Sequence, residues 1–229
     1  MILEQINLKN KELTGYLSEI EKLIPEMIKE TDFEGFEKSN KPLQDHLSHR
    51  QESLSEDYIT KLISTGSGHF GYPDYGYMHA LTQGTAEGSE SPIHAKFHTE
   101  MNALNSKILY FLGAYNEGLF SIYPPGGFIG WHNNANAHGL NLIITWSENG
   151  SGHFKYKDDQ GETQYIYDKP GWQAKMAYFA PYYHEEYQPL YHAAETDCWR
   201  FTCAYRFADE GGSGSKEMWE ELKADLEVD

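Results

Sequence analysis

Two patterns of hydrophobic and polar positions divide the chain near residue 116. Before this point, apolar residues recur every three or four positions, which is typical of amphipathic helices. After it, short runs of β-branched and aromatic residues alternate with turn sequences, which is typical of strands. We therefore expect a helical and loop part (1–115), a β core (116–208), and a Gly/Ser linker with a short acidic helix (209–229).

The first part is predicted to contain helices at three places. Apolar residues over 13–24 keep the helical period, and Pro25 is expected to interrupt this helix because proline lacks the backbone donor. A short helix is predicted over 56–63. Ser91-Pro92 supplies a capping residue and a first-turn proline, so a longer helix is predicted over 92–114.

The segments between these helices are expected to be loops. Residues 34–56 are charged and carry little periodicity. Residues 66–91 are rich in Gly, Tyr and Ser, and a loop of this length is often functional. Two interpretations of it stay open: a lid whose Tyr72, Tyr75, Tyr77 and His79 meet a substrate, or a plain connection packed on the core.

Eight strands are predicted in the β core. They lie near 119–123, 127–133, 140–147, 152–157, 163–168, 172–180, 189–194 and 198–207. Strands at such spacing, separated by turn sequences such as Pro-Pro-Gly-Gly, predict a mainly β fold of the sandwich or jelly-roll type. The C-terminal helix carries Trp219 and Leu222 on one side and is expected to dock on the body of the protein.

Composition narrows the choice of partners and compartment. The 229 residues include 18 Lys+Arg and 35 Asp+Glu, a net charge of −17, which counts against nucleic acid or an anionic membrane surface as a partner. No stretch approaches the roughly 18 apolar residues of a membrane helix, and the first residues lack a signal-peptide pattern. Cys198 and Cys203 are expected to face opposite sides of one strand, unbridged, in a reducing cytoplasm.

One segment with candidate chemistry is Tyr-Pro-Pro-Gly-Gly-Phe-Ile-Gly-Trp-His-Asn-Asn, residues 123–134. The prolines and glycines predict a tight turn that leads into a strand. Alternate residues of a strand share a face, so His132 and Asn134 are expected to point the same way. Such a pair on one strand is suited to binding a metal.

A second candidate segment carries His192 and, after a short turn, a return strand with Arg200 and Thr202 on one face. A guanidinium group grips a carboxylate in a bidentate manner, and a hydroxyl adds one more donor. A buried arginine also needs such a partner, because an unpaired buried charge is very costly. Arg206, further along this face, is expected at the surface. Lys155 and Lys175 on inner strands either contact the substrate or co-substrate or, as we expect, have solvated ends.

The spacing of these residues resembles that of the Fe(II)- and 2-oxoglutarate-dependent dioxygenases, nearest to the prolyl-4-hydroxylase-like branch. That family has a tyrosine nine residues before its first metal-binding histidine, as Tyr123 precedes His132 here. It also has an arginine or lysine eight to eleven residues after the distal histidine, often with Ser or Thr two residues beyond. Here His192 is followed by Arg200 and Thr202 at that spacing.

This resemblance covers about 117–208 and implies a fold, cofactors and a reaction. The fold would be a double-stranded β-helix, a kind of jelly roll. The two histidines would bind Fe(II), and Arg200, aided by Thr202 and Tyr123, would bind a carboxylate of the co-substrate 2-oxoglutarate. The reaction would be oxidation of a C–H bond, usually hydroxylation, in a peptide, an amino acid or a small metabolite.

Asn134 departs from the family pattern, which has Asp or Glu at this position. Three interpretations stay open: the amide is a weak third metal ligand, it is not a ligand and water or halide fills the position, or the site is degenerate. His184 is the rival of His192 for the role of distal ligand.

Two further classes of function stay open. The first is a non-catalytic jelly-roll binding protein that has lost its metal, which iron affinity would distinguish. The second is a cupin-like metal enzyme that does not use 2-oxoglutarate, which dependence on 2-oxoglutarate would distinguish.

Overall fold

The structure is a computed structural model of the whole chain. It describes residues 3–30, 48–65, 71–82, 92–181, 188–207 and 216–228. The prediction for His184 lies outside the described residues, as do the predictions for 66–70 and 83–91 of the long loop and for 34–47.

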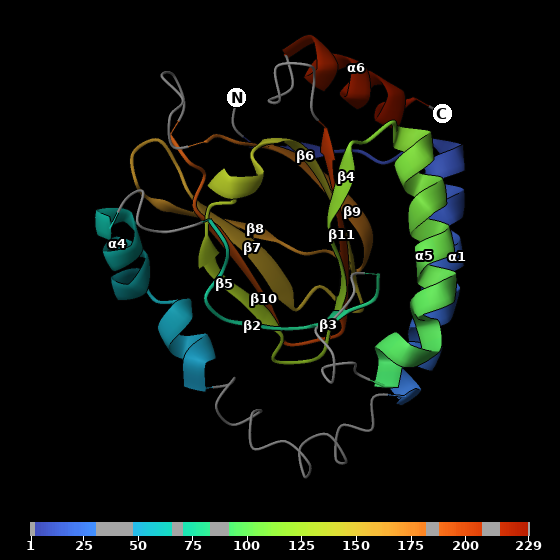
Figure 1. Cartoon of the computed structure of the whole chain (residues 1–229), viewed down its shortest axis with the longest axis horizontal. Coiled ribbons are helices and arrows are strands. Elements are labelled where there is room, and N and C mark those ends of the chain that lie inside the picture. Colours follow the sequence, from blue (N-terminus) through green and yellow to red (C-terminus); the bar gives the residue numbers. More distant parts are fainter. Residues whose placement is uncertain are drawn as a thin grey trace.

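Two antiparallel sheets face each other and form the core (Figure 1). The six-stranded sheet has the order β1 (Leu3–Ile6), β9 (Gly171–Phe179), β6 (Gly139–Ser147), β11 (Arg200–Phe207), β4 (Asn116–Tyr123) and β3 (His79–Ala80). The five-stranded sheet has the order β2 (Gly76–Tyr77), β5 (Phe128–His132), β10 (His192–Thr196), β7 (Gly152–Lys157) and β8 (Thr163–Tyr167). From β4 to β7 successive strands alternate between the sheets, as in a jelly roll. The predicted fold class is confirmed.

All eight predicted strands form, because alternation and turn residues are local signals. The seventh is displaced: β10 begins at His192 and ends at Thr196, whereas the pattern predicted 189–194. The three additional strands are only two to four residues long. Strands this short show no alternation, and they exist because a partner strand supplies their hydrogen bonds, as β9 does for β1.

Helices cover the outer faces of both sheets. α1 (Lys11–Glu30) and α5 (Pro92–Leu112) lie side by side against the six-stranded sheet, and α4 (Glu56–Thr65) lies beside the five-stranded one (Figure 1). α6 (Lys216–Glu227) packs its apolar side into the same core as α1. In the described ranges, no helix is long and apolar enough to cross a membrane.

Two expectations about the helical part are wrong. Residues 48–53 are helical, where a loop was expected. α1 continues through Pro25 to Glu30, although proline removes a helix hydrogen bond. Burial explains the difference, since Ile24 and Met27 on either side of the proline are in the core and their packing outweighs the local cost. The Asn10 side chain caps the start of this helix by accepting two backbone N–H bonds.

Candidate functional site

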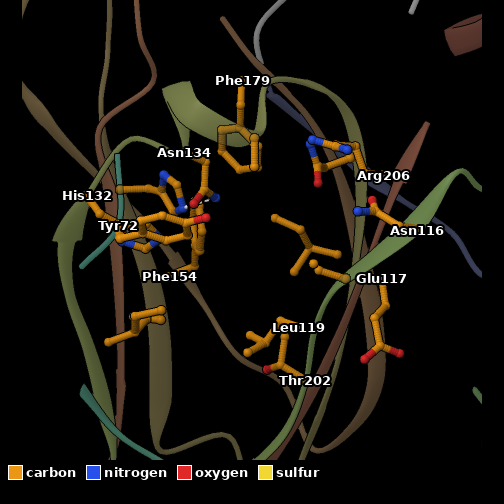
Figure 2. A pocket seen from close by; sticks show the side chains of 18 of the residues that line it. Tyr72, Asn116, Glu117, Leu119, His132, Asn134, Phe154, Phe179, Thr202 and Arg206 are labelled. Atoms are coloured by element: carbon orange, nitrogen blue, oxygen red, sulfur yellow. Dashed lines mark hydrogen bonds between the residues drawn. The ribbon is translucent and has the colours of Figure 1, made fainter. Parts of the chain in front are cut away.

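A cavity of about 270 Å³ lies between the two sheets (Figure 2). Its walls combine apolar side chains with a small number of polar groups, a composition typical of small-molecule sites. His132, Asn134 and His192 lie on one wall, at the ends of β5 and β10. Arg200 and Thr202 reach the cavity from β11.

The two histidines are direct partners across β5 and β10. Their ring centroids are 4.1 Å apart. Each Nδ1 bonds a backbone carbonyl two residues earlier in the chain, at 2.8 Å for His132 and 2.9 Å for His192. Because a carbonyl only accepts, each Nδ1 carries the proton and each Nε2 keeps its lone pair, which is the tautomer that a metal ligand needs.

Aromatic rings enclose His192. Phe179 stacks on it at 4.6 Å between centroids and Phe154 at 5.4 Å. This burial, and then the nearby His132, hold the pKa of His192 well below its ordinary value of 6.5. The ring is therefore neutral at pH 7, as metal binding requires.

Asn134 reaches the cavity by a different route from the predicted one. β5 ends at His132, and Asn134 adopts a left-handed conformation with φ 53°, which asparagine tolerates better than most residues. Its N–H donates to the carbonyl of Gly71 at 2.9 Å. Its amide nitrogen lies 3.4 Å from Nε2 of His192, so amide and imidazole meet at one point of the cavity.

Among the described residues, the donor set at this wall includes no carboxylate. Across the described ranges there is no group of three or more His, Cys, Asp or Glu side chains that could hold a metal ion. Two imidazoles with fixed tautomers and one adjacent amide remain. With the Asn134 amide turned so that its oxygen replaces the nitrogen now beside His192, this set fits a divalent metal ion held by two histidines and an amide oxygen. It is one carboxylate short of the usual iron(II) triad.

Arg200 lies in a buried network at the base of the cavity. Its Nε donates to Asp168 at 2.8 Å, and the two side chains are only 2% and 1% exposed. Its two terminal nitrogens donate to Thr202 at 2.8 Å and Thr145 at 3.3 Å. The Tyr123 ring lies beneath the guanidinium group at 5.5 Å. The chain itself therefore supplies a carboxylate partner for Arg200, and the sequence did not identify Asp168 as that partner.

Lys175 does not have the solvated end that was expected. The residue is 2% exposed, and its Nζ lies 4.8 Å from the centroid of the Phe154 ring. Burial and the charge of Arg200 lower its pKa to about 7, while Asp168 acts in the opposite direction. The network thus contains two basic groups and one carboxylate.

Arg206 is also placed differently from the prediction. It lines the cavity, because β11 alternates regularly and directs residues 200, 202, 204 and 206 to one face. Of the loop candidates, Tyr72 lines the cavity (Figure 2), whereas Tyr77 and His79 are buried in β2 and β3.

In sequence, the chain matches no protein-family profile and no curated protein. A Pseudomonas putida prolyl-4-hydroxylase is similar in structure, with 14% identity over 54% of this chain and 70% of that chain, at a TM-score of 0.31. A 2OG-Fe(II) oxygenase family oxidoreductase from Burkholderia pseudomallei has 10% identity over 72% of this chain and 85% of that chain, at a TM-score of 0.33. A cupin domain from Bordetella pertussis has 15% identity over 38% of this chain and 75% of that chain, at a TM-score of 0.24. Similarity of this degree transfers no activity.

Proposed function

We propose that this protein is an Fe(II)- and 2-oxoglutarate-dependent oxygenase that hydroxylates a C–H bond of its substrate. One observation carries the proposal: two histidines whose protons are held on Nδ1 share a cavity with the buried guanidinium group of Arg200. Metal-binding imidazoles alone would equally suit a cupin-like enzyme. The basic network is what favours an anionic co-substrate.

In this proposal His132 and His192 hold the metal through Nε2, and the amide oxygen of Asn134 is a weaker third ligand. Bound iron(II), together with 2-oxoglutarate, supplies the activation of molecular oxygen. The backbone carbonyls that accept from each Nδ1 keep both rings in position. Phe154 and Phe179 exclude water from this wall, which strengthens every polar interaction inside.

Charge balance explains how Arg200 would bind the distal carboxylate of 2-oxoglutarate although Asp168 already contacts it. Arg200 has five N–H donors, and three of them are used by Asp168, Thr202 and Thr145. With Lys175 protonated, two positive charges face one carboxylate. A buried excess of charge is costly, so binding of a second carboxylate is favoured. Tyr123, whose pKa burial raises to about 12, stays a neutral phenol beside it.

The missing carboxylate favours one alternative, a non-catalytic binding protein with a degenerate metal site. In this alternative the cavity keeps its shape and its basic network but does not hold iron. Replacing Asn134 by aspartate separates the two functions, because it restores the usual ligand set.

The test is an anaerobic titration of metal-free protein with Fe(II) and then 2-oxoglutarate, followed through the weak visible charge-transfer band of the chelate. We expect a band in the wild type and a weaker 2-oxoglutarate affinity in Arg200→Gln. Arg50→Gln is the control, because Arg50 pairs with Glu195 and Asp197 away from the cavity.

Two results would contradict the proposed function. A band that forms only in Asn134→Asp would show a degenerate site. No band in either protein would show that the site does not hold iron and 2-oxoglutarate together.

A further inference from the structure

A second arginine of the cavity is not used by the proposed function. The chain contains three arginines, and two of them, Arg200 and Arg206, line this cavity. In a protein with a net charge of −17 this concentration of guanidinium groups is unexpected unless the cavity receives anions. Figure 2 shows Arg206 and Asn116 on the wall that faces His132 and Asn134.

Among the described residues, no acidic side chain forms an ion pair with Arg206. Its Nε is buried and, among the described residues, has no hydrogen-bond partner. The Tyr115 ring lies 5.1 Å from the guanidinium carbon and fixes its position. Glu117 lines the cavity too, but its carboxylate bonds Thr82 and Asn105 and points away from Arg206 (Figure 2). Arg206 is therefore a half-buried cation at the cavity wall, and no carboxylate in the described part of the chain neutralises it.

The two arginines are too far apart to share one small carboxylate. They are six residues apart on β11, which is roughly 20 Å at about 3.4 Å per residue. Asp168 holds Arg200 at its end of the strand. The cavity between them is lined mainly by apolar side chains, including Leu119, Ile143 and Phe179. These walls therefore suit one anion at each end of the cavity and an apolar segment between the two anions.

We propose that Arg206, with the amide of Asn116, binds a carboxylate of the substrate, and that the substrate is a small acid with a short apolar body. The inference rests on the proposed function, since it assigns Arg200 to 2-oxoglutarate and Arg206 to the substrate. A guanidinium fork matches a carboxylate better than it matches a single anionic oxygen. A cavity of about 270 Å³ also suits a small molecule better than a peptide.

The test measures binding of hexanoate and of its neutral counterpart hexanamide to the metal-free protein by titration calorimetry at fixed pH and salt. We expect hexanoate to bind the wild type at least tenfold more tightly. Arg206→Gln should remove the difference, Arg206→Lys should keep part of it, and Arg50→Gln should leave it unchanged. Hexyl phosphate, measured in parallel, shows whether the site prefers the planar carboxylate, as we expect.

The inference is overturned if hexanoate and hexanamide bind equally or not at all, if hexyl phosphate binds more tightly than hexanoate, or if folded Arg206→Gln keeps the preference. It is also overturned if Arg206→Gln abolishes the 2-oxoglutarate chelate band while Arg200→Gln does not, because Arg206 would then bind the co-substrate and the proposed function would stand. If no chelate band forms but Arg206 still selects hexanoate, the proposed function fails and the carboxylate site stands.

Discussion

Replacing Lys175 by methionine is predicted to stabilise the ligand-free protein and to weaken its binding of a carboxylate. Lys175 is 2% exposed and contacts the Phe154 ring, and among the described residues it forms no ion pair. Its strongest neighbour of like charge is Arg200, and Asp168 only partly compensates. A buried ammonium group in this position destabilises the fold whenever it is charged.

The size of the effect follows from the pKa of Lys175, which falls from 10.5 to about 7 on folding. Between these two pH values the unfolded chain holds a proton that the folded protein has released, so stability rises with pH by about 1.4 kcal/mol per unit. The destabilisation caused by the buried ammonium group therefore has its full size below pH 7 and disappears as the pH rises towards 10.5. At pH 7 it is at most about 4 kcal/mol, and methionine removes it while it preserves the packing of the apolar stem.

Urea unfolding of the metal-free protein at pH 6, 7, 8 and 9 measures this effect. We expect Lys175→Met to be more stable than the wild type at pH 7, with a gain that shrinks at each higher pH. Lys169→Met, at an exposed position just before the same strand, is the control and should change little at any pH. The same variant should bind 2-oxoglutarate more weakly, because one of the two positive charges is lost.

Two results would refute this reasoning. If Lys175→Met is no more stable than the wild type at pH 7, the ammonium group is solvated in solution. If the gain in stability is independent of pH, its cause is better packing and not the removal of a charge.

Two other substitutions test the scaffold of the site by the same unfolding measurement. Asp168→Asn should destabilise the protein by about 3–5 kcal/mol, because it leaves Arg200 as an uncompensated buried charge. The control Asp159→Asn, at an exposed position, should change stability little. A small loss of stability in Asp168→Asn would show that water solvates the network. Gly127→Ala should cost about 1–3 kcal/mol, because the new Cβ would lie 2.7 Å from a backbone carbonyl of the turn. Gly15→Ala in α1 should instead be stabilising, because its new Cβ would have no neighbour within 4 Å. Equal effects of the two substitutions on stability would argue against the tight turn.

The sequence predicted the fold well because its signals are local. Alternation, turn residues and caps act within a few residues, and they placed all eight core strands and α5. Pro25 shows the limit of such signals, since a local cost to the helix was outweighed by packing against a sheet that lies far away in the sequence.

The candidate site was predictable where residues act at short spacing. His132 and Asn134 are two residues apart, and Arg200 follows His192 by eight. Asp168 was not predictable, because its approach to Arg200 depends on how strands pair across 32 residues of sequence. Lys175 was missed for a related reason, since its burial depends on the facing sheet.

Arg206 occupies an intermediate case. The alternation of β11 already placed it on the face of Arg200, although we expected it at the surface. The Tyr115 ring, just before β4, lies against its guanidinium group, a contact that no local pattern shows.

Asn134 combines two physical roles that the sequence alone could not separate. An Asp or Glu two residues after a histidine on a straight strand would need only β geometry. Here the strand has ended, and position 134 has a positive φ, which favours asparagine for the backbone irrespective of any ligand. The amide is therefore not by itself a sign of a decayed metal site, because the backbone accounts for it. The argument for or against iron rests instead on the two imidazoles, whose tautomers and neutral state the surrounding carbonyls and rings maintain.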